Sequence, residues 1–307
     1  MGVQACELKR LPLDATIPPL AQRASYGVAC EVAGVVAEAR FDDSEAAALY
    51  RRRYRHVLTD RPARMFTYAV ARRPNEVYFW GSGESAYCWD HCNIGPNRIS
   101  FFADALTTTE VFTSVDGVVA LHGAAVSDGS GVAAILGSSN SGKTTTAVAC
   151  ARRGLTVYSD EFCVISDGEV VPFPRAINLR GGGLALLAAD ARSRSPIDRW
   201  LRAQSGGDAN DVGFDELFGS LPASAERKPL RVVFSVAGTA DDARAKPISA
   251  AQMIGHAKPW AKMKPRGLEA VHGLLAMLHD VACYELWLGT PDRTARLVAQ
   301  MLEGVTP

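Results

Sequence analysis

The chain has 307 residues, of which 48% are hydrophobic and 21% charged, and its 33 basic and 33 acidic side chains give a formal net charge of zero. Such a composition is that of a globular protein with a sizeable core, and it argues against nucleic-acid binding, which needs a clustered basic excess. No apolar run reaches the roughly 18 residues of a membrane span, and the N-terminus has no signal-peptide core. We therefore expect a cytoplasmic protein without a membrane or nucleic-acid partner. Its seven cysteines, an odd number spread along the chain, fit free thiols in that compartment.

The first hundred residues are typical of a mixed α+β unit. Residues 42–58 (DDSEAAALYRRRYRHVL) predict a helix, which the initial DDS would cap. The stretches RMFTYAVAR and EVYFWGS alternate well enough to be strands, and the RPN between them predicts a turn. We expect a smaller α+β domain over residues 1–105 and a second domain over residues 106–307.

The second domain interleaves predicted strands and helices, which indicates an α/β layer structure. GVAAIL predicts a buried strand, and TTTAVACARRG predicts a helix that stops at Gly154. LTVYSDEFCVI predicts one further strand, PLRVVFSVAG another, and residues 283–304 a strand, a turn and a helix. The polar segment 188–228 is either a lid or substrate-contacting insertion, or a plain surface excursion.

Residues 137–144, GSSNSGKT, match the phosphate-loop pattern G-x-x-x-x-G-K-[ST] in full, between a predicted strand and a predicted helix. Glycines let backbone N–H groups curl toward phosphate oxygens, and the helix N-terminus adds its positive dipole end. The alternative is a tight strand–helix turn with an exposed lysine. The residues expected to bind nucleotide are Gly137, Ser138, Ser139, Asn140, Ser141, Gly142, Lys143, Thr144 and Thr145. Lys143 would reach the β- and γ-phosphates and the Thr144 hydroxyl would hold Mg²⁺, so the pattern predicts ATP and Mg²⁺ as cofactors.

An acidic pair, Asp160 and Glu161, follows the predicted loop helix. A chain that runs down that helix and back up a neighbouring strand brings both carboxylates beside the γ-phosphate. One acid there can hold Mg²⁺ while the other acts as general base for an attacking hydroxyl. Because either acid can be the one that holds the metal, the predicted metal ligands are Thr144, Asp160 and Glu161. The alternative is a solvated pair in a turn.

Residues 121–165 resemble the core of the HPr kinase/phosphorylase superfamily, whose nucleotide domain is similar to that of PEP carboxykinase. The resemblance lies in the order of His122-Gly123, the phosphate loop and the acidic pair. The tail CYELWLGTPDRTARLVAQML and the stretch KPISAAQMI also resemble divergent HPr-kinase-related proteins of peptide-maturation clusters. The resemblance implies an α/β P-loop nucleotide domain of the HPr-kinase/PEP-carboxykinase-like type.

The resemblance also implies roles for individual residues. Asp160 matches the catalytic acid/base, and His122 would contact the γ-phosphate or that acid. Arg180, in INLRGGG, matches a retained arginine, either a phosphate contact or a plain surface cation. Asn178 stands where the family has a metal-holding glutamate, and the acidic pair is Asp-Glu where two aspartates are usual. These departures favour kinase activity alone over the combined kinase and phosphorylase activity of the family.

Together these features predict a kinase that moves the γ-phosphate of ATP to a hydroxyl, with Asp160, His122, Lys143 and Arg180 as the catalytic residues. The expected acceptor is a Ser or Thr of a small protein or peptide. A small-molecule alcohol and a non-catalytic nucleotide sensor are the alternatives. The N-terminal domain would recognise the acceptor or mediate assembly into a homo-oligomer.

Overall fold

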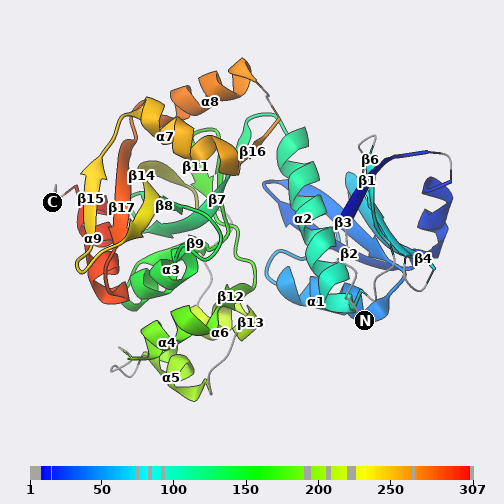
Figure 1. Cartoon of the computed structure of the whole chain (residues 1–307), viewed down its shortest axis with the longest axis horizontal. Coiled ribbons are helices and arrows are strands. Elements are labelled where there is room, and N and C mark those ends of the chain that lie inside the picture. Colours follow the sequence, from blue (N-terminus) through cyan, green and yellow to red (C-terminus); the bar gives the residue numbers. More distant parts are fainter. Residues whose placement is uncertain are drawn as a thin grey trace, which may run out of the picture. The chain divides into compact units, whose positions relative to one another are not determined.

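The computed structural model divides into two compact units, Met1–Ser114 and Val115–Pro307 (Figure 1). The predicted boundary after residue 105 falls inside a helix, α2 (Pro96–Ser114), which stays with the N-terminal unit. The structure describes residues 8–14, 16–73, 76–81, 85–90, 94–189, 195–204, 209–219, 226–264 and 267–304.

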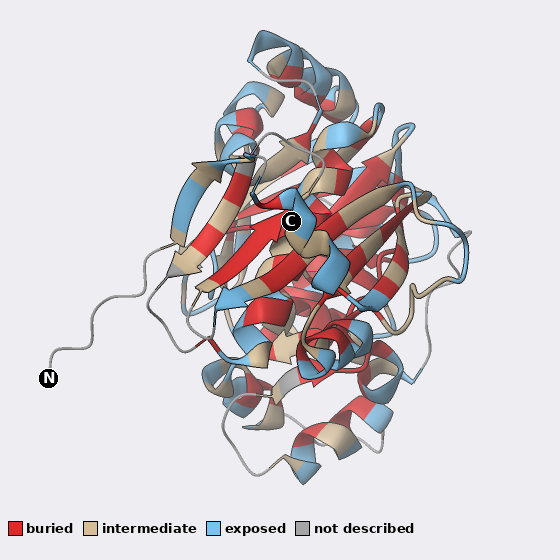
Figure 2. Cartoon of the chain, turned by 90° about the vertical axis from the view of Figure 1, so that its right-hand side faces the viewer, coloured by how far each residue is buried: buried red, intermediate tan, exposed pale blue. Residues whose placement is uncertain are grey.

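The N-terminal unit is a six-stranded sheet in the order β1-β6-β5-β4-β3-β2, in which only the β3–β4 pair is parallel. Its elements are β1 (Leu8–Pro12), η1 (Pro18–Arg23), β2 (Tyr26–Val32), β3 (Val35–Phe41), α1 (Ser44–Arg53), β4 (Met65–Arg73), β5 (Glu76–Trp80), β6 (Ser85–Asp90) and α2. The two strands predicted here are confirmed as β4 and β5. The predicted helix is confirmed as α1 but ends at Arg53, short of residue 58, and Asp43 caps it by accepting a hydrogen bond from the Ala46 N–H at 2.9 Å. Buried side chains alternate with more exposed ones along several of these strands (Figure 2).

A buried polar network joins α1 to α2 inside this unit. The Arg53 guanidinium lies 3.4 Å from the Asp104 carboxylate, and the Tyr54 hydroxyl donates to the same carboxylate. Both members of the ion pair are almost fully buried. Because removing one partner of a buried pair leaves a charge stranded away from water, the network fixes how the two helices pack.

The C-terminal unit is built on a nine-stranded mixed sheet in the order β11-β10-β7-β8-β14-β17-β15, with β9 and β16 also paired to β7. The strands β8, β14 and β17 are mutually parallel, whereas β7 runs antiparallel to β8. The bounds of these strands are β7 (Val118–Ser127), β8 (Val132–Leu136), β9 (Thr156–Ser159), β10 (Phe162–Ser166), β11 (Glu169–Val171), β14 (Lys228–Thr239), β15 (Arg244–Pro247), β16 (Ala261–Met263) and β17 (Ala282–Leu288).

Helices cover both faces of this sheet, which makes it an α/β layer structure. Along β8, Ala133 and Ile135 pack with the helices α3 (Lys143–Arg152) and α9 (Pro291–Leu302). Ala134 and Leu136 belong to the opposite core, with α7 (Ala250–Ala257) and α8 (Leu268–Leu278). This alternation follows from the two-residue period of a strand, and a strand buried on both faces reads as the continuous apolar run GVAAIL. A short 3-10 helix, η2 (Lys258–Trp260), leads from α7 into β16.

Two expectations for this unit change. The single strand predicted over residues 155–165 is wrong, because the chain breaks at the acidic pair and forms β9 and β10 on either side. The polar segment 188–228 contains packed structure, since α5 (Pro196–Ala203) and α6 (Phe214–Phe218) bury apolar side chains in the α3 core. Residues 190–194, 205–208 and 220–225 of that segment lie outside the described residues. The same core takes in β12 (Ile177–Leu179), β13 (Ala209–Val212) and α4 (Gly181–Ala189). No helix in the described part of the chain is long and apolar enough to cross a membrane.

Candidate functional site

The loop of residues 137–144 connects β8 to α3, as the sequence predicts. Gly142 adopts φ +96° as the N-cap of α3, a left-handed conformation that favours glycine, and a Cβ there would lie 2.7 Å from a methyl of Leu288. A Cβ on Gly137 would lie 2.6 Å from Ser141 Oγ and 3.2 Å from Val236 Cβ. The tight path of this loop therefore requires glycine at both ends of the motif.

The ammonium of Lys143 is folded back over this loop. Its Nζ donates to the carbonyl oxygens of Gly137 at 2.9 Å and Ser138 at 2.7 Å, and the side chain is buried. Burial lowers the pKa of Lys143, while the negative charges of Glu161 and then Asp160 oppose that shift. Lys143 is therefore not the exposed lysine of the alternative interpretation, and the acidic pair lies within electrostatic reach of its ammonium.

Asp160 is the most perturbed carboxylic acid of the site. Its side chain is buried, with 8% relative exposure, and burial together with the adjacent charge of Glu161 raises its pKa to about 7. The charge of Arg175 and a hydrogen bond from Thr144 work against this rise, and Thr144 Oγ1 lies 3.4 Å from Asp160 Oδ2. The alternative of a solvated pair of acids in a turn does not describe Asp160, and a carboxyl group with a pKa near neutrality is suited to proton transfer.

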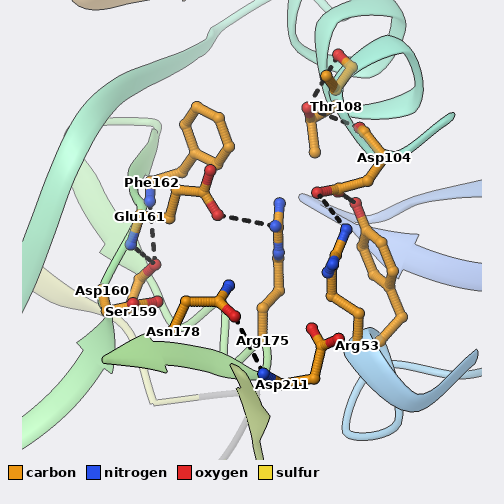
Figure 3. A network of polar contacts seen from close by, with 12 residues as sticks. Arg53, Asp104, Thr108, Ser159, Asp160, Glu161, Phe162, Arg175, Asn178 and Asp211 are labelled. Atoms are coloured by element: carbon orange, nitrogen blue, oxygen red, sulfur yellow. Dashed lines mark hydrogen bonds and ion pairs between the residues drawn. The ribbon is translucent and has the colours of Figure 1, made fainter. Parts of the chain in front are cut away.

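A serine shapes the corner that presents the acidic pair. Ser159 Oγ accepts hydrogen bonds from the N–H groups of Glu161 at 3.3 Å and Phe162 at 3.1 Å (Figure 3). The Glu161 carbonyl in turn accepts from the N–H of Gly123, at 2.9 Å, which ties the corner to β7. Ser159 thus takes the place of a strand partner where the chain turns, and this is the local cause of the break between β9 and β10.

Glu161 is held by a residue that the sequence reasoning missed. Arg175 NH2 lies 2.8 Å from Glu161 Oε2, and its side chain is only 3% exposed (Figure 3). The guanidinium also lies over the rings of Phe162, at 5.8 Å, and Phe173, at 5.7 Å. Arg175 comes from the irregular segment between β11 and β12, where no motif or periodicity singles it out, so only the folded chain places it here.

His122 lies on β7 between charged groups of both signs. Burial and then the Lys143 ammonium lower its pKa, the charge of Glu161 opposes them, and Lys262 lowers it further. The imidazole is therefore mostly neutral at pH 7. Its ring lies 5.7 Å from that of Phe162 in an edge-on arrangement. The structure thus brings His122 together with the predicted lysine and acidic pair.

Lys262 is a second cation of the site that the sequence alone does not select from several lysines. It lies on β16, and its Nζ is 4.7 Å from the centre of the Phe162 ring.

Arg180, by contrast, is exposed directly before α4. The first turn of α4 lies against α3, since a Cβ on Gly183 would collide with Thr145 Oγ1. Asn178 Oδ1 accepts from a backbone N–H of β13 at 3.0 Å, so this side chain fastens β12 to β13.

The residues present fit a bound nucleotide phosphate and Mg²⁺. Ser141 Oγ is buried and has no hydrogen-bond partner in the described part of the chain, and the Gly137 position leaves no room for a side chain beside it. The hydroxyl of Thr144 and the carboxylate of Asp160 are oxygen donors of the kind Mg²⁺ prefers. Among the residues that the structure describes, no group of three or more His, Cys, Asp or Glu side chains gathers into a metal cage. Mg²⁺ needs no such cage, because it commonly binds through one or two carboxylates and the phosphates of its nucleotide.

No protein-family model and no curated protein matches the sequence. Among solved structures, the chain is similar to the HPr(Ser) kinase/phosphatase from Coxiella burnetii, with a TM-score of 0.26 and 14% sequence identity. That alignment covers 60% of this chain and 93% of the other. The likeness is a distant one.

Proposed function

We propose that the C-terminal unit is a Mg²⁺-dependent kinase that transfers the γ-phosphate of ATP to a hydroxyl group. The observation that carries this proposal is the buried Asp160 carboxyl, 3.4 Å from the Thr144 hydroxyl at the end of the 137–144 loop, with a pKa raised to about 7. A phosphate-binding loop alone fits many nucleotide-binding proteins. A loop that ends beside a carboxyl group able to take up a proton near neutrality favours transfer to a hydroxyl.

The loop residues are proposed to bind the nucleotide. Backbone N–H groups of residues 137–144 and the N-terminus of α3 would face the phosphates, and Lys143 would exchange its two loop carbonyls for phosphate oxygens. Thr144 and Asp160 would hold Mg²⁺, with Glu161 as the further predicted ligand. When bound, Mg²⁺ neutralises charge on the β- and γ-phosphates.

Asp160 is proposed to be the general base. Its carboxylate takes the proton of the acceptor hydroxyl while that oxygen bonds to the γ-phosphorus, and ADP leaves with the electron pair of the broken P–O bond. His122, mostly neutral, can donate a hydrogen bond to the transferring group or to Asp160, and Arg180 would add positive charge from the start of α4. The acceptor we propose is a Ser or Thr of a small protein or peptide.

The test is transfer of label from γ-labelled ATP with Mg²⁺, using the full chain and size-fractionated host extract. We expect label in a protein or peptide fraction, and its loss in Lys143→Ala and Asp160→Asn. Asp280→Asn and Lys246→Ala are the matched controls, because Asp280 is 94% exposed and Lys246 is exposed on the edge strand β15. Both controls should transfer label at the parent rate.

Three outcomes contradict parts of the proposal. Label confined to small molecules would move the acceptor to a metabolite while keeping the mechanism. Tight ATP binding without transfer to any fraction would make the protein a nucleotide sensor. Near-parent turnover in Lys143→Ala would refute the phosphate-binding role of the 137–144 loop.

A further inference from the structure

The strand β16 places a lysine at one end of the proposed site. Two strands occupy the same edge of β7 in succession: β8 pairs with residues 123–127, and β16 pairs with residues 119–121. The 137–144 loop leaves the sheet between them. Lys262 is paired with Ala120 of β7, whereas the last residue of β8, just before the loop, is paired with Gly123. Lys262 and the start of the loop are therefore separated by three residues of β7, about 10 Å along that strand.

The side chain of Lys262 crosses the face of β7 that carries His122. Residues paired across a sheet share a face, so Lys262, Ala120 and His122 point to the same side. The ammonium reaches the ring of Phe162, at 4.7 Å from its centre, although β10 lies on the other edge of β7. The ring of Phe162 is therefore close to both the His122 ring and the lysine head group, with Arg175 also 5.8 Å from its centre.

Charges divide this region into two ends. His122 lies on β7 between the level at which the loop leaves the sheet, at Gly123, and the level of Lys262, at Ala120. Lys143 belongs to the loop proposed to bind ATP, which leaves Lys262 at the end away from the nucleotide. The segment around it, HAKPWAKMK, holds three lysines and no acidic residue, and both Lys258 and Lys264 are exposed.

We propose that Lys262 is a specificity residue that binds a carboxylate of the acceptor, and that the acceptor is a Ser or Thr within an acidic peptide segment. This inference rests on the proposed kinase function and names its substrate class. Lys262 lies three strand residues along β7 from the level at which the loop leaves the sheet, a separation that a carboxylate near the reacting hydroxyl of a peptide can span more readily than the compact body of a small alcohol. The neutral ring of Phe162 fixes the ammonium where an incoming carboxylate can pair with it.

The experiment measures peptide binding separately from transfer. Fluorescein-labelled peptides with one central Ser carry flanking Asp/Glu, the isosteric Asn/Gln, or Lys, and their binding to the full chain is followed by fluorescence anisotropy. We expect the parent to prefer the acidic peptide over its amide counterpart by about tenfold, the size of one charge-assisted hydrogen bond. Lys262→Ala should abolish that preference, and Lys262→Glu should reverse it in favour of the Lys-flanked peptide.

Lys264→Ala is the matched control, because it removes the same charge from the same segment while Lys264 pairs with Asp116 at 2.7 Å on the surface. It should retain the preference for acidic peptides. An equal loss in both variants would overturn the inference, since diffuse positive charge would then explain binding. Failure of the parent to prefer acidic peptides overturns it as well. So does a loss of ATP affinity in Lys262→Ala as large as the loss of peptide affinity.

The same peptides separate this inference from the proposed function. A Lys262-dependent preference in binding without transfer of γ-label would refute the kinase and leave the acidic-peptide site standing. Transfer to neutral and acidic peptides alike, unaffected by Lys262→Glu, would leave the kinase standing and refute the specificity residue.

Discussion

The substitution Asp160→Asn should stabilise the protein at alkaline pH while it removes the proposed base. A buried carboxyl with a raised pKa opposes folding once the unfolded chain ionises. The pKa rises from 3.8 to about 7 on folding, so the folded state favours the protonated acid. The loss of folding free energy that results is absent below pH 3.8, grows as the pH rises from 3.8 to about 7, and is complete above pH 7.

The size of the effect follows from the shift. At about 1.4 kcal/mol per pKa unit, roughly three units correspond to a penalty on the order of 4 kcal/mol above pH 7, and to less than about 1 kcal/mol at pH 4. Asparagine has nearly the same shape but no charge to desolvate. Its amide oxygen can still accept from the Thr144 hydroxyl, but a neutral acceptor makes a weaker hydrogen bond than a carboxylate, so the expected net gain at pH 8 is about 2–4 kcal/mol.

The assay is urea denaturation of the full chain and of Asp160→Asn at pH 4.5 and pH 8. Hydrogen exchange of peptides from β8 and α3 reports the C-terminal unit separately from the N-terminal one. Asp280→Asn, at an exposed position, should change neither curve by more than about 0.5 kcal/mol. The reasoning is refuted if Asp160→Asn is destabilised at pH 8, or if its effect is the same at both pH values.

Three further predictions concern the same site. In the parent protein, phosphoryl transfer should rise with pH through about 7 and then level off, as Asp160 ionises, in a kcat/KM profile. Because the charge of Glu161 raises the pKa of Asp160 and that of Arg175 lowers it, Glu161→Gln should move the acid limb to lower pH. Arg175→Ala should move it to higher pH, and shifts in the opposite directions would contradict the electrostatic account. In Gly142→Ala, an alanine must adopt a φ of +96° and its methyl group meets Leu288. The substitution should therefore lower the free energy of unfolding, measured by urea denaturation, by about 1–3 kcal/mol, and it should weaken ATP binding in equilibrium titration.

The sequence predicted well those parts of the site whose determinants are local. The apolar run before Gly137, the glycines of the loop and the helical spacing after Lys143 all act within a few residues, so β8, the loop and α3 follow from the pattern alone. The break between β9 and β10 was missed because it depends on the Ser159 side chain, which replaces strand pairing at a single corner.

Arg175 and Lys262 were beyond such reasoning for a different physical reason. Arg175 lies in irregular chain between short strands, and Lys262 lies on a strand of three residues that exists only because β7 offers a free edge beyond β8. Both reach the site through pairings between distant parts of the chain. The residues next to such a position in the sequence show no periodicity or motif that would predict its role, whereas the residues around a motif do.

The opposing charges around Asp160 explain why its pKa lies near neutrality. Burial and the like charge of Glu161 both raise the pKa of Asp160. The charge of Arg175 lowers the pKa of Asp160 and so opposes these two effects, while its guanidinium pairs with Glu161 at 2.8 Å. A base is most effective when its pKa is close to the working pH. A buried arginine outside the 137–144 pattern thus helps to keep the pKa of Asp160 in the useful range, and pH profiles of Arg175 variants are the direct way to measure its contribution.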